Sequence, residues 1–186
     1  MLKGQAENSG NAKFSNKKYY QIRALIFSKF GSFKALGEKM RADMRIQYVA
    51  EVLKNGDTQP ALVASAEPFL ISAYSDEMDA VVMLEFPKEL MVKYKLSVGS
   101  RLVASCVYGE DGPSDTVDDI FPGEGCLGKF RAFFPVVQLF LASNEDEVVA
   151  RTSLFDEDKW RRVESLTKEY LEKHPGMKRD GFRCFK

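Results

Sequence analysis

Apolar residues in the first quarter of the chain recur every three or four positions, which is the spacing of one face of a helix. From Tyr19 this spacing joins positions 19, 22, 25 and 30, and a second series runs from Phe33 to Met44. Gly31 and Ser32 separate the two series. The pattern therefore predicts two N-terminal helices.

The stretch from Ile46 to Leu53 fits two different periods. Its apolar and polar residues nearly alternate, which indicates a strand. Val49 and Val52 also have the spacing of a helix that continues through the segment. Both interpretations end the element at Asn55-Gly56-Asp57, where the residues favour a turn.

Short apolar runs separated by turn residues fill the middle of the chain, and such runs are typical of strands. The expected strands are 61–64, 69–74, 80–86 and 101–108, with an acidic hairpin loop over 75–79. Pro87 is suited to the first turn of a helix, because a missing N–H costs nothing there. A short helix is therefore predicted over 88–94.

A long polar segment, 109–128, follows the last of these strands. Residues 129–141 are rich in Phe and Val and are predicted as a core strand, with a short helix starting at Pro135 as the alternative. A final helix is expected to begin near Ser153 or Asp156 and to end at 174–176. Its apolar face consists of Trp160, Val163, Leu166 and Tyr170.

Taken together, these elements predict an α+β fold with N-terminal helices, a central mainly antiparallel sheet of short strands, and a packed C-terminal helix. Residues 1–18 contain few large apolar groups, so we expect a flexible tail there and a single domain over 19–186. The chain is 45% hydrophobic and 29% charged, which is typical of a protein that folds.

Charge is distributed unevenly although the net charge is zero. Residues 1–45 contain ten Lys and Arg against three Asp and Glu, a net charge of +7, whereas residues 46–125 contain five against fourteen, a net charge of −9. The basic segment could follow a phosphate backbone. Because the protein as a whole has no positive field, we expect no nucleic-acid partner.

The acidic residues of the 75–79 hairpin and of the 109–128 segment are the candidate binding residues. An acidic surface suits a basic protein partner, because complementary charges steer association and set specificity. The segment could instead hold a cation, but its spacing does not match a calcium-binding loop, and we expect no metal and no cofactor. The candidates are Asp76, Glu77, Asp79, Asp115, Asp118 and Asp119.

The string Gly-Glu-Gly-Cys-Leu-Gly-Lys over 123–129 contains the glycine and lysine spacing of a phosphate-binding loop. Phe130 follows it where Ser or Thr would bind Mg²⁺, and Pro135 interrupts the helix that should follow. The sequence therefore favours an ordinary glycine-rich connection.

Nucleophilic catalysis has one candidate pair in this sequence, Cys126 in its glycine setting and the sole histidine, His174. His174 also fits a helix end, where it would interact favourably with the dipole. The common hydrolase, zinc-protease and dinucleotide signatures are absent from the sequence.

Cys106, Cys126 and Cys184 form no CxxC pair, and an odd number of cysteines argues against a disulfide framework. No window approaches the length of a membrane-spanning segment. We therefore expect a soluble cytoplasmic protein without a membrane partner. The favoured function is a non-enzymatic protein-binding or regulatory module, of the inhibitor or immunity type, that uses an acidic face. The alternative is a small enzyme or ligand-binding protein with its site in 109–128.

Overall fold

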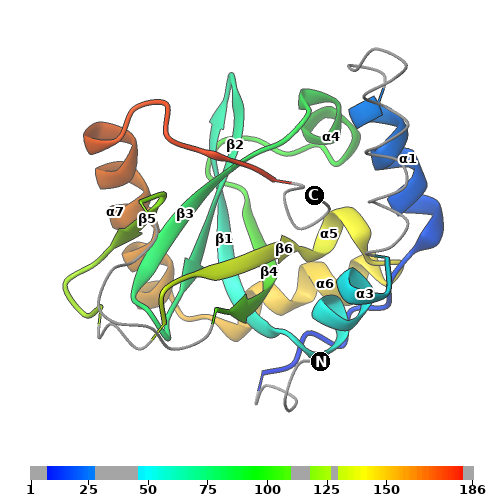
Figure 1. Ribbon diagram of the computed structural model, residues 1–186, viewed down its shortest axis with the longest axis horizontal. Helices are drawn as coiled ribbons and strands as arrows, with labels where there is room; N and C mark the ends of the chain where they lie inside the picture. Colours follow the sequence, from blue (N-terminus) through cyan, green and yellow to red (C-terminus); the bar gives the residue numbers. More distant parts are fainter. Residues whose placement is uncertain (1–7, 28–45, 110–117, 127–129, 182–186) are drawn as a thin grey trace.

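The computed structural model describes residues 8–27, 46–109, 118–126 and 130–181 (Figure 1). Its strands form one curled sheet in the order β5-β3-β2-β1-β4-β6, and β7 pairs with β3. The pairings are antiparallel except that of β3 with β7. The strands are β1 (Asp57–Ala66), β2 (Phe69–Ser75), β3 (Ala80–Glu85), β4 (Arg101–Tyr108), β5 (Ile120–Pro122), β6 (Phe133–Val137) and β7 (Arg179–Asp180).

The helices lie toward two sides of this sheet: α7 on one side, and α1, α3, α4, α5 and α6 gathered toward the other (Figure 1). They are α1 (Asn16–Phe27), α3 (Ile46–Asn55), α4 (Lys88–Lys93), α5 (Gln138–Leu141), α6 (Glu145–Ala150), the 3-10 turn η1 (Arg151–Leu154) and α7 (Glu157–Lys173). Helices followed by an antiparallel sheet and a terminal helix confirm the predicted α+β class.

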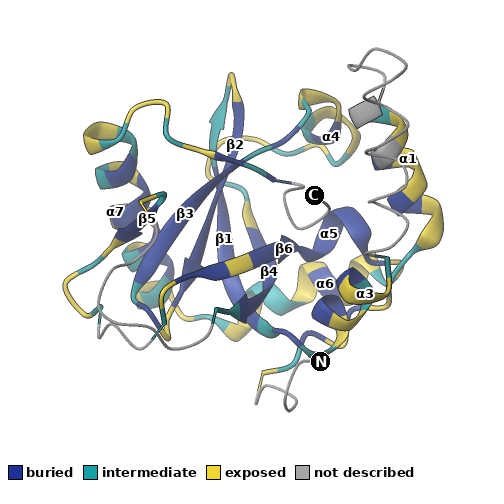
Figure 2. Cartoon of the chain, in the orientation of Figure 1, coloured by how far each residue is buried: buried dark blue, intermediate teal, exposed yellow. Residues whose placement is uncertain are grey.

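Both faces of the sheet are covered, and this explains why its strands read as continuous apolar runs. Residues 80–84 of β3 are all buried (Figure 2). Along this strand, Val82 and its alternate neighbours belong to the larger core cluster, whereas Val81 and Met83 pack with residues of α7. The period of two therefore divides one strand between two cores.

The segment over 46–55 is the helix α3, which resolves the two interpretations left open by the sequence. Val49, Val52 and Leu53 are buried on one side of it. These positions are three and four residues apart, so the helical period places them together, whereas a strand would divide them between two faces. The helix ends where Gly56 N–H donates to the carbonyl of Val52.

Residues 8–18, which the sequence assigned to the tail of 1–18, pack against the rest of the fold. Ala12 is buried, and its N–H donates to the carbonyl of Leu53 in the last turn of α3. A Cβ at Gly10 would lie 2.7 Å from the same carbonyl oxygen. Backbone hydrogen bonds and a close glycine contact hold this stretch, and a count of large apolar side chains does not detect either.

The segment 129–141 contains the predicted strand, limited to β6, and then the short helix α5, which begins at Gln138 and not at Pro135 as the alternative proposed. Pro135 lies within β6, which is the last strand in the sheet order. An edge strand tolerates proline because one of its sides needs no ladder hydrogen bonds. The predicted helix over 33–44 lies outside the described residues.

The C-terminal helix agrees closely with its prediction. Asp156 is the N-cap, and its Oδ1 accepts a hydrogen bond from Lys159 N–H at 2.8 Å. Trp160 is 1% exposed, and the other three predicted apolar residues are buried as well. The preceding helix α6 and the turn η1 were not predicted, since their sequence is polar with few apolar positions.

Candidate functional site

Antiparallel pairing brings the start of β1, the end of β2 and the end of β4 to the same end of the sheet. In the β1–β4 ladder Asp57 is opposite Cys106, two residues before Tyr108 at the end of β4. In the β1–β2 ladder Ala61 is opposite Ala73. Because the strands are antiparallel, the start of β1 lies beside the end of β2 at Ser75. Polar groups that lie far apart in the sequence therefore meet at this end.

Gln59 holds two carboxylates at this end of the sheet. Its Nε2 donates to Asp57 Oδ2 at 2.6 Å and to Asp76 Oδ1 at 2.5 Å. Its Oε1 accepts from the backbone N–H of Asp76 at 3.2 Å. Gln59 itself is 1% exposed, so a buried neutral amide fixes the two acidic side chains on either side of it.

Tyr108 supports the same carboxylate from the other side. Its hydroxyl donates to Asp57 Oδ2 at 3.0 Å and accepts from Ser75 Oγ at 3.2 Å. Its ring stacks on Phe130, with centroids 4.7 Å apart. We name Asp57, Gln59, Asp76, Glu77 and Tyr108 the carboxylate site.

The electrostatics of the carboxylate site disfavour its own negative charge. Burial raises the pKa of Asp57; hydrogen bonds from Gln59 and Tyr108 oppose this effect, and the charges of Asp76 and Glu77 add to it. Lys159 compensates in part, with its Nζ 3.5 Å from Asp76 Oδ2. The site is therefore rich in hydrogen-bond acceptors, and the burial of Asp57 disfavours its negative charge.

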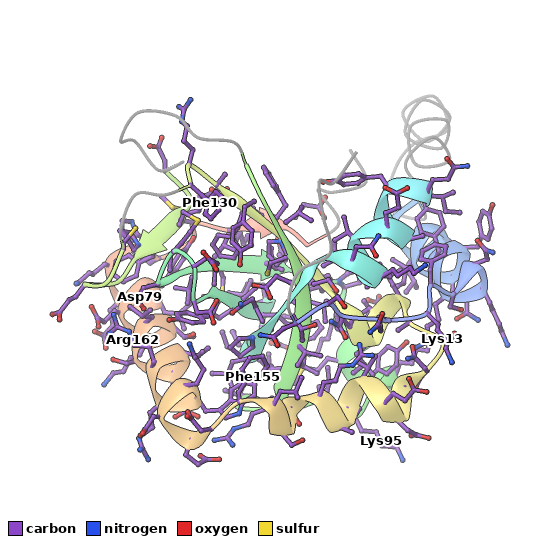
Figure 3. The ribbon with its side chains drawn as sticks, turned by 90° about the horizontal axis from the view of Figure 1, so that it is seen from below. Lys13, Asp79, Lys95, Phe130, Phe155 and Arg162 are labelled. Carbon is purple, nitrogen blue, oxygen red and sulfur yellow. The ribbon has the colours of Figure 1, made fainter. Side chains whose placement is uncertain are left out.

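Asp79, at the far end of the same hairpin, is held by three other elements (Figure 3). Its carboxylate accepts from Arg162 Nε at 3.0 Å and Nη2 at 2.5 Å, from Tyr74 hydroxyl at 2.9 Å and from Gly125 N–H at 2.8 Å. The Arg162 hydrogen bonds are the largest cause that lowers the pKa of Asp79. This carboxylate is engaged inside the protein.

The same contacts explain two glycines of the phosphate-loop-like string. A Cβ at Gly123 would lie 2.5 Å from Asp79 Oδ2, and one at Gly125 would lie 2.9 Å from it. The backbone N–H that a phosphate-binding loop would offer to a nucleotide is donated by Gly125 to the carboxylate of Asp79. Residues 127–129 of the string lie outside the described part.

Asp119 lies apart from the acidic residues of the 75–79 hairpin. Arg179 donates to its carboxylate through Nε at 2.5 Å and Nη2 at 2.6 Å, and through Nη1 to the carbonyl of Phe133 at 2.7 Å. This buried guanidinium links β5, β6 and β7. In the β3–β5 ladder Ala80 is opposite Pro122, so Asp118 and Asp119, which precede β5, lie at the opposite end of β3 from the hairpin.

These contacts divide the candidate binding residues into groups. Asp76 and Glu77 lie in the carboxylate site, while Asp79 and Asp119 are held by arginines. Asp118 is exposed, and Asp115 lies outside the described residues. No family model, curated protein or solved structure matches this chain. The functional argument therefore rests on the geometry of the site itself.

The candidate catalytic pair is not joined by any hydrogen bond between the described side chains. His174 lies at the C-terminal end of α7, and its ring packs against Phe121 and Tyr170, with centroids 5.5 Å and 5.8 Å apart. Cys126 is half-buried, and its N–H donates to the carbonyl of Gly123. The third cysteine, Cys184, lies outside the described residues.

Two further searches cover the described ranges alone. Among those residues, no group of three or more His, Cys, Asp and Glu side chains has an arrangement that could hold a metal ion. No helix in the same part of the chain combines the length and the apolar character needed to cross a membrane.

Sequence reasoning missed three members of the carboxylate site: Asp57, Gln59 and Tyr108. Asp57 belongs to the predicted Asn55-Gly56-Asp57 turn, and a turn residue gives no sign of a functional role. Gln59 and Tyr108 lie at strand positions, where a polar side chain gives no signal of its own. Only the strand order, which places three strand ends together, would have identified them.

Proposed function

We propose that this chain is a non-enzymatic binding or regulatory protein, of the inhibitor or immunity type, that recognises a positively charged group of another protein through the carboxylate site. We place it in the cytoplasm, as the cysteine pattern suggests. Nucleic acid is not the expected partner, since the proposed site is acidic.

The observation that carries this proposal is the pair of carboxylates held around one buried amide. A carboxylate that is only partly solvated is stabilised by a cation placed beside it, and Asp57 has a neutral amide and a hydroxyl there instead. An incoming Lys or Arg side chain would supply the missing charge. Complementary charges across an interface steer association and set specificity.

The site is also accessible from solvent. The Asp76 side chain is 39% exposed, and Glu77 beside it is exposed as well. Asp79 and Asp119 are held by arginines inside the protein and serve the scaffold. The acidic face proposed here is therefore smaller than the one predicted from the sequence, and its described members lie at one end of the sheet.

Isothermal titration with a hexa-arginine peptide tests the proposal. We expect saturable binding, weakened about tenfold in an Asp76→Asn/Glu77→Gln variant, since two partly exposed ion pairs together contribute about 1.4 kcal/mol. The matched control is Glu164→Gln/Glu172→Gln, which removes the same charge from exposed positions of α7. Equal weakening by both variants would show non-specific attraction and contradict the proposal.

The second candidate function is the small ligand-binding protein or enzyme. One observation favours it: Gly109 N–H donates to the carbonyl of Ala132 at 2.7 Å, and Tyr108, which donates to Asp57, stacks on Phe130. The described residues on either side of the segment therefore lie together near Asp57. A carboxyl group with a raised pKa could serve as a general acid there. If arginine amide bound as tightly as the hexa-arginine peptide, recognition of a single small molecule would be favoured over a protein surface.

A further inference from the structure

A basic face lies toward the opposite end of the molecule from Asp79 and the acidic residues next to it. In Figure 3, Asp79 and Phe130 are toward one end of the long axis and Lys13 is toward the other. Lys13 precedes α1, and Lys17 lies in its first turn; both are exposed. Lys93 of α4 belongs to the same face, because its Nζ donates to Gln21 of α1 at 3.1 Å.

An exposed aromatic ring accompanies these lysines. Tyr20 is 51% exposed and lies three residues after Lys17, on the same side of the helix. Tyrosine is enriched at protein interfaces relative to the rest of the surface. We name Lys13, Lys17, Tyr20 and Lys93 the α1 basic face.

Acidic residues of α6 border this face and neutralise part of it. Glu145 lies 2.6 Å from Lys18, which is buried, and Glu147 lies 4.0 Å from Lys13. Lys17 and Lys93 have no ion pair among the described contacts. The positive charge available to a partner is therefore centred on α1 and on the neighbouring end of α4.

We propose that the α1 basic face docks the acidic end of a second copy of this chain, so that the molecules associate head to tail. The inference rests on the proposed function, since the acidic end includes Asp76 and Glu77 of the carboxylate site together with exposed Glu124. The net charge of the whole chain is zero, so two copies do not repel one another as a whole. The two faces carry opposite charge and are therefore complementary between two molecules.

Sedimentation equilibrium tests this association. At about 20 mM salt the average mass is expected to rise above the 21.0 kDa of the single chain as concentration increases. At about 0.5 M salt it is expected to return to the monomer value, with the dissociation constant at least about tenfold higher, because exposed charges are then screened. A wild-type protein that stays monomeric at low salt would overturn the inference.

A charge swap makes the test specific to these two faces. Lys13→Glu/Lys17→Glu leaves a molecule with two acidic faces, and Glu77→Lys/Glu124→Lys leaves one with two basic faces. Each variant alone should be monomeric, and an equal mixture should form a complex. Wild-type association that both variants retain would overturn the inference. Circular dichroism checks that each variant is folded. The salt series uses the wild type alone, so it tests the inference even if a variant does not fold.

The outcomes separate this inference from the proposed function. A monomer that binds the hexa-arginine peptide through Asp76 and Glu77 would keep the proposed function and remove self-association. Loss of both activities would remove the two proposals together.

Discussion

Asp79 shows how one residue can connect three elements. It has a φ of +40°, in the left-handed region that side chains other than glycine adopt infrequently. Its carboxylate accepts hydrogen bonds from β2, from the glycine loop after β5 and from α7. The surrounding donors hold the residue in this conformation, and removing its carboxylate leaves them without an acceptor.

We therefore expect Asp79→Ala to lower the free energy of unfolding by about 2 to 3 kcal/mol, below the value for a fully buried ion pair because Arg162 is partly exposed. Asp158→Ala is the control: Asp158 forms a surface ion pair with Arg161, and its side chain is 83% exposed. It should change stability by about 0.5 kcal/mol or less. Urea unfolding of both variants measures the difference, and similar effects would show that the Asp79 contacts are not structural.

Asp57 leads to a prediction about pH. Burial raises its pKa above the ordinary 3.8, so the native state holds this proton more tightly than the unfolded chain does. The stability that this group contributes is fully present below pH 3.8 and is lost as pH rises through the higher folded pKa. Asp57→Asn should therefore be more stable than the wild type at neutral pH, with a difference that shrinks as the solution is acidified.

Urea unfolding from acid to neutral pH checks this prediction. The asparagine oxygen can still accept a hydrogen bond from Tyr108 or Gln59, so the comparison isolates the charge. An Asp57→Asn variant that is less stable than the wild type at neutral pH would show that the carboxylate is favourable where it stands. The same variant should bind hexa-arginine more weakly, because the charge that disfavours folding is proposed to favour binding.

At the scale of single elements, the helix α7 could be predicted because its cap and its apolar face are both patterns of residues close together in the sequence. The cap at Asp156 and the apolar face from Trp160 to Tyr170 follow from helical spacing alone. The segment 46–55 was left open because a run of eight residues fits both periods. The burial of Val49, Val52 and Leu53 against the sheet, a tertiary effect, decided it.

A hydrogen bond between two buried hydroxyls joins α7 to the sheet and leads to a prediction for these two elements. Thr167 Oγ1 donates to Ser72 Oγ of β2 at 2.7 Å, and both residues are buried. Thr167→Val or Ser72→Ala alone should cost about 1 to 2 kcal/mol, because each leaves one buried hydroxyl without its partner. The double variant should be nearer to the wild type than the sum of the two single effects.

Chemical denaturation of the four proteins in this cycle measures the coupling. A double variant whose loss equals the sum of the single losses would show that the two hydroxyls do not interact. An exposed pair such as Lys168→Ala and Glu172→Ala, whose charged atoms are 4.0 Å apart, should show a coupling of only about 0.3 to 0.5 kcal/mol.

At the scale of the whole molecule, the sequence predicted the class of the fold but not the site. Acidic hairpin residues could be found from composition, and Asp76 and Glu77 are members of the carboxylate site. Asp57 and Tyr108 could not be found, because their proximity depends on the pairing of β1 with β4, strands separated by two others in the sequence. Local patterns do not encode that order.

Asp79 and Asp119 were predicted as binding residues, but each forms an ion pair inside the protein. Their partners, Arg162 and Arg179, come from the C-terminal part of the chain, so no local pattern indicates these pairs.

The central claim is that the carboxylate site recognises a positive group. The most direct test maps the amide chemical shifts of isotope-labelled protein during titration with hexa-arginine peptide. We predict saturable shifts at Asp57, Gln59, Asp76 and Tyr108, lost in the Asp76→Asn/Glu77→Gln variant. Saturable shifts confined to the exposed acids of α7, or no saturable shifts at all, would contradict the account.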